Sequence, residues 1–309
     1  MRIYVSASSI KKTIRTAGLP LNDLPRFIRG HGFEGLELTD EQVSISDRAD
    51  LQSFRQSCIE ADCGLIIDIN SDLTYSDRKL LQQEVSHVKR MLHTGNELGA
   101  KCLRIFLGGQ SFSIQNLRKK KHATSAHNDR KTLPGATHRS LLNALLLNSW
   151  VLRLAHVVRK NMQSRVRNLE GKMKRAVVSL EQIMPAVVHC KIPLAIENHW
   201  GISGRPENII KVIEEIESEW LGTCPDFGNF PRNVDPYKSL KALGPYALHA
   251  HAKSYRFDKY GEVKEIDYKR CLSILQESGY EGDFTVEYEG GGNDLQGCLR
   301  TRDLILKYW

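Results

Sequence analysis

Short apolar runs with the character of β-strands alternate with helical patterns along almost the whole chain of 309 residues. Such runs are rich in β-branched residues, whereas the segments between them repeat their apolar residues at helical spacing. Alternating strands and helices predict a parallel sheet, because each helix carries the chain back to the starting edge. Eight strands are predicted, at residues 3–7, 32–38, 65–69, 102–107, 194–200, 221–226, 246–251 and 283–287.

Eight strand–helix units are the number that a closed (β/α)₈ barrel requires. An open doubly wound sheet is the alternative, but such a sheet normally carries a glycine-rich phosphate loop after its first strand. No such loop follows residues 3–7. We therefore predict an α/β fold of the (β/α)₈ TIM barrel type, with residues 1–309 forming a single domain.

One segment, at about residues 110–172, interrupts the alternation after the fourth strand and far exceeds the ~2–6 residues of an ordinary βα loop. Residues 118–175 hold fifteen Lys and Arg against two acids, whereas the rest of the chain holds 29 basic and 34 acidic residues. We predict a mobile basic loop, followed by an amphipathic helix around residues 147–162. Four roles stay open: a lid or phosphate-binding flap, a surface for an acidic partner or second subunit, a nucleic-acid contact, or a solvated loop with a packed helix.

The composition places the chain among ordinary globular proteins, with 41% hydrophobic and 26% charged residues. No apolar run approaches the ~20 residues of a membrane span, and no signal-peptide pattern precedes the first strand. We therefore expect a cytoplasmic protein without a membrane span. The seven cysteines are scattered and contain no CxxC pair, which predicts buried free thiols without a chemical role.

Polar residues stand at the ends of the last four predicted strands, which is the rim where α/β barrels keep their chemistry. They are Glu197, Asp226, His249 with His251, and Glu287 with Glu289. A single strand-end carboxylate is more often a cap or a loop salt bridge, but four such groups on successive strands would repel one another without a cation. Three carboxylates and one imidazole suit Mn²⁺ or Mg²⁺ best, with Co²⁺ or Zn²⁺ as alternatives. The sequence thus predicts a site for one divalent ion.

Several phrases of this chain resemble the xylose isomerase-like TIM-barrel superfamily of sugar phosphate isomerases and epimerases. The resemblance covers nearly the whole chain outside residues 110–172 and is stronger for the fold and the metal site than for the reaction. The phrases are Gly32-Phe-Glu-Gly-Leu-Glu37, Ala195-Ile-Glu-Asn-His199, Asp226-Phe-Gly-Asn229, His249-Ala-His-Ala-Lys253 and Val286-Glu-Tyr-Glu-Gly290.

The resemblance implies that Glu197, Asp226, His251 and Glu287 are the metal ligands and that Glu197 and Glu287 are the acid/base pair. The implied chemistry is proton transfer through a metal-bound cis-enediolate, because a metal that holds a ketone oxygen acidifies the neighbouring C–H.

Two positions depart from the pattern of the ketose epimerases. Asn229 stands where these epimerases have a histidine, and Phe257 stands where they have an arginine, with Arg256 adjacent. Because those groups contact substrate in the epimerases, the resemblance does not fix the sugar.

Six further residues are candidates for substrate binding, and each also has a structural alternative. His199 and Lys253 follow strand ends, and either can act as an acid, a base or a second-layer partner. His249 shares a strand face with His251 and is expected beneath it, whereas Glu37 can bind a hydroxyl or pair inside the barrel. The full set is His199, Lys253, His249, Glu37, Asn229 and Arg256.

The leading hypothesis is a divalent-metal-dependent isomerase or epimerase of a sugar or sugar phosphate. The alternative is a dehydratase or lyase that acts on a keto sugar or inosose, because elimination can start from the same intermediate. The implied partner is a small sugar or polyol, free or phosphorylated, and we expect a homo-oligomer.

Two other classes rank lower. Related apurinic endonucleases bind three zinc ions through extra histidines, and this chain offers Asp68 and Asn70, residues 108–110, Asn229 and residues 258–260 in those regions. Nucleic acid is therefore not the expected partner. An intact set of four ligands argues against a non-catalytic binding subunit.

Overall fold

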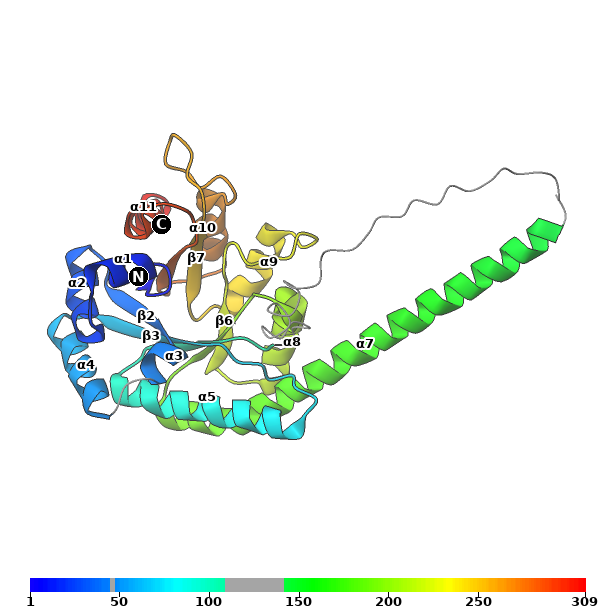
Figure 1. Cartoon of the computed structure of the whole chain (residues 1–309), viewed down its shortest axis with the longest axis horizontal. Coiled ribbons are helices and arrows are strands. Elements are labelled where there is room, and N and C mark those ends of the chain that lie inside the picture. Colours follow the sequence, from blue (N-terminus) through cyan, green and yellow to red (C-terminus); the bar gives the residue numbers. More distant parts are fainter. Residues whose placement is uncertain (45–47, 109–141) are drawn as a thin grey trace, which may run out of the picture. The chain divides into compact units, whose positions relative to one another are not determined.

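The computed structural model describes residues 1–44, 48–108 and 142–309, and of residues 44, 48 and 142–165 it describes the main chain alone (Figure 1). The chain divides into two compact units, Met1–Gly109 with Lys172–Trp309, and Gln110–Gly171. The predicted basic loop lies outside the described residues, so its role and the proposed division of the chain stay predictions. In the part of the chain that is described, no helix combines the length and apolar character that crossing a membrane requires.

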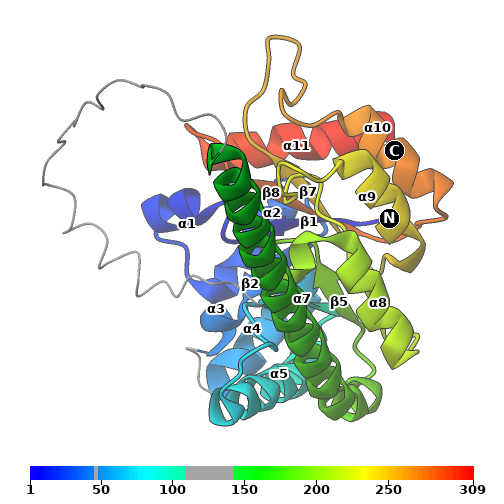
Figure 2. The same cartoon turned by 90° about the vertical axis from the view of Figure 1, so that its right-hand side faces the viewer.

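Eight parallel strands form one sheet in the order β6-β5-β4-β3-β2-β1-β8-β7. Figure 2 shows strands of this sheet inside a ring of helices. The predicted (β/α)₈ TIM barrel is therefore confirmed. The strands are β1 Ile3–Ser6, β2 Gly35–Thr39, β3 Gly64–Ile69, β4 Cys102–Ile105, β5 Leu194–Glu197, β6 Leu221–Cys224, β7 Ala250–Ser254 and β8 Phe284–Tyr288.

The barrel closes between β6 and β7 through two isolated parallel bridges, Thr223 to Ala247 and Asp226 to His251. Pro225 lies between the two bridged positions of the β6 segment, and it has no N–H to donate to a ladder. Its carbonyl oxygen still accepts a hydrogen bond of 2.9 Å from the His251 N–H. This closure places Asp226 directly beside His251.

Helices follow the strands and cover the outside of the barrel (Figures 1 and 2). Several begin at a side chain that accepts main-chain N–H groups, as Asp77 does for α5 and Asp267 for α10. The helices are α1 Lys11–Ala17, α2 Leu24–Gly30, α3 Asp40–Ser44, α4 Arg48–Glu60, α5 Arg78–Leu98, α7 Leu142–Cys190, α8 Pro206–Ile216, α9 Pro236–Leu243, α10 Tyr268–Glu277 and α11 Asp294–Tyr308.

Three features differ from the sequence-based expectation. Strand β7 begins at Ala250, four residues later than predicted, because Gly244–Tyr246 forms a short 3₁₀ turn first. Helices α1 and α3 were not predicted, and both are short, with seven and five residues. The helix predicted around residues 147–162 is part of one longer helix, α7, which continues to Cys190. The expected end of the insertion near residue 172 therefore falls inside a helix.

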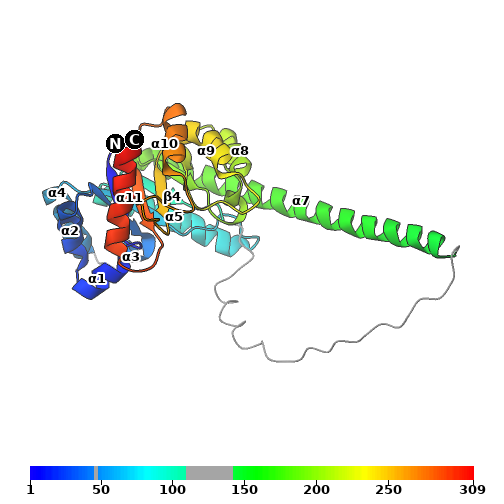
Figure 3. The ribbon, with the colours of Figure 1, turned by 90° about the horizontal axis from the view of Figure 1, so that it is seen from above.

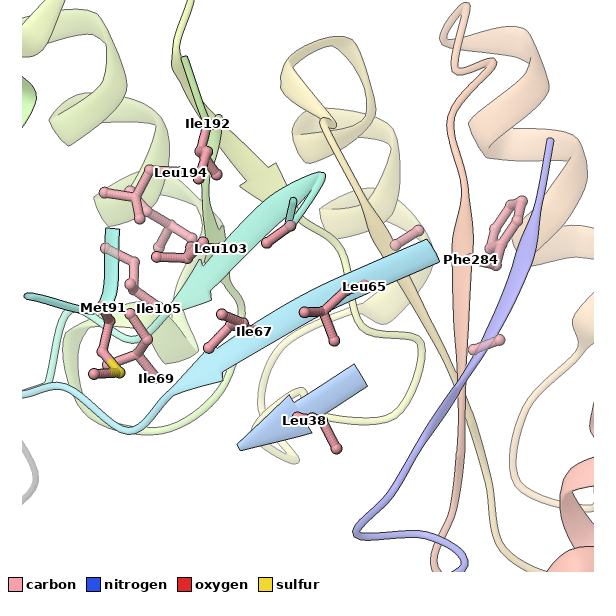
Figure 4. Close-up of a cluster of buried hydrophobic side chains, with 14 of the residues drawn as sticks. Leu38, Leu65, Ile67, Ile69, Met91, Leu103, Ile105, Ile192, Leu194 and Phe284 are labelled. Carbon is pink, nitrogen blue, oxygen red and sulfur yellow. The ribbon is translucent and has the colours of Figure 1, made fainter. Parts of the chain in front are cut away.

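Side chains alternate between the two faces of each strand. The outward-facing ones, among them Leu65, Ile67 and Leu103, pack against the helices in the main apolar core (Figure 4). The inward-facing ones form a separate cluster in the barrel interior: Tyr4, Ile66, Cys102, Ala195 and Cys224. The interior is thus filled by side chains, and the polar groups lie beyond this layer, toward the carboxyl ends of the strands.

The two termini lie side by side (Figure 3). Trp309 at the end of α11 packs against Phe284 with 5.0 Å between ring centroids. Phe284 in turn pairs with Ile3 in the β1–β8 ladder. Packing of the residue that follows the last helix therefore stabilises the junction between the first and last strands.

Candidate metal centre at the carboxyl ends of the strands

Four side chains from the ends of β5 to β8 converge on one point. Each of Glu197, Asp226, His251 and Glu287 offers one ligand atom, and these atoms all lie within 4.8 Å of one another. Nδ1 of His251 lies 3.7 Å from Glu197 Oε2, 3.9 Å from Asp226 Oδ2 and 3.6 Å from Glu287 Oε1. The four residues that the sequence singles out are therefore neighbours in space.

Three of these ligand atoms have no hydrogen bond within the described residues, although each is buried: Glu197 Oε2, Asp226 Oδ2 and His251 Nδ1. Buried polar atoms are nearly always satisfied in folded proteins, because an unsatisfied one costs about 1–3 kcal/mol. Charged side chains lie near two of these atoms, but a cation bound between them would satisfy all three at once.

Glu37 on β2 fixes the orientation of His251. Its Oε2 atom lies 3.1 Å from His251 Nε2, and both side chains are at most 1% exposed. An ionised carboxylate only accepts hydrogen bonds, so Nε2 carries the proton and donates it to Glu37. The other ring nitrogen, Nδ1, then faces the other three ligand atoms, and this is the carboxylate–histidine arrangement common around protein-bound metals.

Glu197 is held from two sides. Its Oε1 atom accepts a hydrogen bond of 2.7 Å from Asn229 Nδ2, and its Oε2 atom lies 2.9 Å from Arg104 Nε on β4. Burial opposes ionisation of Glu197, but the charges of Arg104 and His251 outweigh it and hold its pKa well below the usual range. Glu197 is therefore a carboxylate with a fixed direction.

Arg104 also pairs with Asp68 on β3, its neighbour in the β3–β4 ladder. Burial raises the pKa of Asp68 to about 8, although Arg104 acts in the opposite direction. Arg104 on β4 thus links the side chains of Asp68 on β3 and Glu197 on β5 next to the ligand atoms.

Asp226 is positioned by the main chain and by Asn198. Its Oδ1 atom accepts hydrogen bonds from the N–H groups of Gly228 at 2.6 Å and Asn229 at 2.8 Å. Asn198, directly after β5, accepts from Asp226 N at 2.7 Å and donates to Asp226 O at 3.0 Å. Only Oδ2 of Asp226 therefore remains available as a ligand atom beside Glu197, His251 and Glu287. Burial, with Glu197 and Glu287 nearby, raises the pKa of Asp226 to about 7.

Lys253 on β7 pairs with the fourth ligand. Its Nζ atom donates to Glu287 Oε2 at 2.5 Å and to Glu289 Oε1 at 2.8 Å, and it lies 3.6 Å from Asp226 Oδ2. The side chain is only 2% exposed. Glu287 therefore has one oxygen on Lys253 and the other, Oε1, directed toward His251.

Acidic groups outnumber basic groups at this end of the barrel. Five carboxyl groups, with side chains at most 12% exposed, face Arg104, Lys253 and His251. The carboxyl groups are those of Glu37, Asp68, Glu197, Asp226 and Glu287. Burial opposes protonation of His251, but nearby acids raise its pKa well above the usual range. A divalent ion bound by Asp226 and His251 would replace protons that these groups otherwise retain. The donor set of three carboxylates and one imidazole fits such an ion.

A second set of possible ligands, Glu37, His249 and His251, also lies within 4.8 Å. Both imidazoles of this set already have partners, because His251 Nε2 bonds to Glu37 and His249 Nε2 lies 2.7 Å from Thr285 Oγ1, whereas Glu37 Oε1 has no hydrogen bond within the described residues. Burial lowers the pKa of His249 to about 3, so this imidazole is neutral. The four-residue set, with three unsatisfied atoms, is the better candidate.

The six residues predicted to bind substrate fall into different surroundings. Glu37 and His249 lie inside the barrel at 1% exposure, whereas Lys253 and Asn229 contact the glutamates of the cluster. Half-buried His199 packs against Phe106, and burial lowers its pKa. Arg256 is 74% exposed and pairs with Glu265 at 2.5 Å. Substrate contact by any of the six stays a prediction.

Sequence reasoning gave no role to Arg104 or Asn198 and mentioned Asp68 only as a position lacking a zinc-binding histidine. Arg104 is the lone charged residue in the apolar run 102–107, and a charge in a buried parallel strand needs a partner. That signal was available in the sequence. No comparable signal marked Asn198, which acts through its contacts with the main chain of Asp226.

Two curated proteins share part of the sequence. An uncharacterized protein from Methanocaldococcus jannaschii, MJ1311, is 22% identical over 141 residues, which are 42% of this chain and 47% of that protein. The alpha subunit of a C-glycoside deglycosidase from Microbacterium trichothecenolyticum is 32% identical over 60 residues, which are 19% of this chain and 16% of that protein. The chain thus spans less than half the length of either relative.

Among solved structures, a D-psicose 3-epimerase from Clostridium cellulolyticum H10, crystallised with D-tagatose, has a TM-score of 0.69 and 11% sequence identity. The match covers 100% of this chain and 99% of the epimerase. At this level of identity the likeness shows the fold alone. It agrees with the eight-stranded barrel described above.

A family model described as the xylose isomerase-like TIM barrel matches residues 138–305, which is more than half of the chain. The match includes all four residues of the candidate metal centre. The chain belongs to the xylose isomerase-like TIM barrel family.

Proposed function

We propose that this protein is a divalent-metal-dependent isomerase or epimerase that acts on a keto sugar or a keto sugar phosphate. The observation that carries the proposal is the convergence of Glu197, Asp226, His251 and Glu287, three of which present a buried ligand atom without a hydrogen bond. The solved structure of similar fold named as a D-psicose 3-epimerase supports the class of reaction.

Glu197, Asp226, His251 and Glu287 would hold the ion. The oxygen-rich donor set favours Mn²⁺, with Mg²⁺, Co²⁺ and Zn²⁺ as alternatives. When bound, the ion supplies Lewis acidity that makes a C–H bond next to a substrate carbonyl more acidic.

The two glutamates are the proposed acid/base pair. They come from β5 and β8, with β6 and β7 between them, so their carboxylates approach the cluster from different directions. In epimerisation one glutamate takes the proton from the carbon beside the carbonyl and the other returns a proton to the opposite face. In isomerisation the proton returns to the neighbouring carbon.

The supporting residues suit the two glutamates to this task. Arg104 and Asn229 fix the direction of Glu197, and Lys253 holds one oxygen of Glu287 at 2.5 Å. A base held in one direction needs little reorganisation when the proton moves. Lys253 also supplies a positive charge close to the place where negative charge develops on the substrate.

A second candidate function is elimination by the same residues. In that reaction the proton is removed as before, but a group on the next carbon leaves with its bonding electrons. The short match to a C-glycoside deglycosidase subunit favours keeping this alternative.

Deuterium exchange tests the proposal. Protein loaded with Mn²⁺ is incubated in D₂O with a panel of keto sugars, their phosphates and inososes, and the carbon-bound hydrogens are followed by ¹H NMR. We expect deuterium beside the carbonyl of at least one compound, and loss of that exchange in Glu197→Gln and in Glu287→Gln.

Glu214→Gln is a matched control, because Glu214 lies on the outer helix α8 and bonds to Tyr246. It should retain full exchange. Elimination products would identify a lyase instead. Exchange that survives in both glutamine variants would refute the assigned roles.

A further inference from the structure

Two of the seven cysteines, Cys58 and Cys63, lie together where helix α4 ends and strand β3 is about to begin. The chain leaves the helix through Asp62, whose φ of 48° is left-handed. Cys63 N donates to Cys58 O at 2.9 Å, and Asp62 N donates to Ile59 O at 3.1 Å. These two bonds define a Schellman motif, in which the side chains at the positions of Cys58 and Cys63 normally touch.

The main-chain hydrogen bond limits how far apart the two cysteines can be. With the N···O distance of 2.9 Å and standard bond lengths, their Cα atoms are at most roughly 6.8 Å apart. Disulfides span Cα separations of about 4.4–6.8 Å. The Cys63 thiol is also close enough to Cys58 to raise, together with burial, the pKa of the Cys58 thiol. The backbone therefore already holds this pair near bonding geometry.

The pair is reachable from solvent although each residue is mostly covered, at 6% exposure for Cys58 and 8% for Cys63. Both line a surface cavity of about 630 Å³. Arg2, Tyr4, Gly64 and Asp283 also line it, and these residues lie at the amino ends of β1, β3 and β8. The cavity is therefore at the mouth of the barrel opposite the candidate metal centre, and a small oxidant can enter it.

The other five cysteines lack this combination. Cys102 and Cys224 face the barrel interior, and Cys271 and Cys298 are at most 1% exposed in the core. The Sγ atom of Cys190 lies 3.7 Å from Nδ1 of His93, so its contact is an imidazole and not a thiol. None of these five lines the cavity that Cys58 and Cys63 share. The pair at the end of α4 is thus distinguished by both contact and access.

We propose that Cys58 and Cys63 are a redox-active pair that closes reversibly to a disulfide when a peroxide enters this cavity. One thiol gives up its proton as its sulfur attacks a peroxide oxygen, and that proton joins the departing hydroxide, so hydrogen peroxide yields a sulfenic acid and one water molecule. The second thiol attacks that sulfur and expels another water, so two thiols and one peroxide give one disulfide and two waters. Reduction by a small dithiol restores the pair.

Closure fastens the last turn of α4 to the residue that precedes β3. This junction is also held by the Schellman hydrogen bonds and by Arg29, whose Nε donates to Ala61 O at 3.0 Å, and its left-handed residue is an aspartate, not a glycine. The modification therefore acts on the stability of the barrel at its amino-terminal mouth. It does not require the proposed isomerase activity.

Peptide mapping of the full-length protein tests the proposal without any variant. Trypsin cuts after Arg55 and after Arg78, and residues 56–78 contain Cys58 and Cys63 and no other cysteine. The protein is treated with hydrogen peroxide, unfolded, alkylated and digested. We expect this peptide to lose both alkyl labels and to be lighter by two hydrogen atoms than its reduced form, with both labels regained after dithiothreitol.

Cleavage at Glu60 adds a direct readout, because the two resulting fragments stay joined only if the disulfide is present. Cys58→Ser should abolish the linkage, whereas Cys271→Ser should retain it. The proposal is overturned if the peptide stays fully alkylated while peroxide oxidises other cysteines. It is also overturned if Cys58 and Cys63 are converted to sulfinic or sulfonic acids without a linked form.

Discussion

Replacement of Arg104 by methionine is expected to lower the free energy of unfolding of the metal-free protein by about 3–5 kcal/mol. The Arg104 side chain is 4% exposed and pairs with Asp68 and Glu197, so the variant leaves the buried Glu197 carboxylate without this counter-charge. At the observed 2.9 Å, the attraction to Glu197 alone is about 6 kcal/mol with an effective dielectric constant of 20. The variant also avoids the free-energy cost of burying the guanidinium charge, and this gain offsets part of the lost attraction.

Urea unfolding followed by circular dichroism, at pH 7 with a chelator present, measures this loss. Adding Glu197→Gln to Arg104→Met removes the stranded charge and should restore about 0.5–3 kcal/mol. The control is Arg256→Met, because Arg256 is 74% exposed in its pair with Glu265 and should cost at most about 1 kcal/mol. A loss below 1 kcal/mol in Arg104→Met, or no recovery in the double variant, would refute the reasoning.

Three further predictions concern the supports of the site and of the barrel. Glu37→Gln should weaken Mn²⁺ binding about 10–100-fold in calorimetric titration, because the carboxylate that orients His251 is lost; unchanged affinity would contradict this role. Gly35→Ala should cost about 1–3 kcal/mol in urea unfolding, since the added methyl group meets the buried Tyr4 ring; a neutral effect would contradict the packing of the interior. Asp294→Ala should cost about 1 kcal/mol at pH 7, because Asp294 accepts N–H groups from the first turn of α1. Burial opposes ionisation of Asp294, but these hydrogen bonds outweigh it and lower its pKa. Its contribution to the free energy of unfolding is therefore full above the ordinary pKa of ~3.9 and disappears as the pH falls through the lower pKa of the folded state. The difference between Asp294→Ala and the unchanged protein should therefore shrink in acid, and a constant difference would contradict the assignment.

The sequence was most informative about features that follow from its hydrophobic periodicity and from the positions of the strand ends. The alternation of apolar runs with helical patterns predicted the eight-stranded barrel, because a parallel sheet buried on both faces demands that composition. Strand ends then indicated which carboxylates share a rim. Glu197, Asp226, His251 and Glu287 do lie together, since the parallel ladders and the closure of β6 on β7 bring their strand ends to one edge.

What the sequence did not reveal depends on register and on tertiary contacts. The pairing of Asp68 with Arg104 follows from the β3–β4 register, which a single sequence does not define. Asn198 acts on the main chain of Asp226, 28 positions away. The late start of β7 reflects a 3₁₀ turn at Gly244–Tyr246 that the apolar pattern does not distinguish from a strand.

Metal binding to the protein after removal of all metal by chelation tests the candidate centre most directly. Titration with Mn²⁺, read by calorimetry and by elemental analysis after dialysis, should give about one ion per chain, as a single four-residue site predicts. Asp226→Asn should weaken that binding strongly, whereas the outer-helix variant Glu214→Gln should leave it unchanged. Failure to bind Mn²⁺ or another divalent ion, or binding that Asp226→Asn does not alter, would contradict the assignment of this centre.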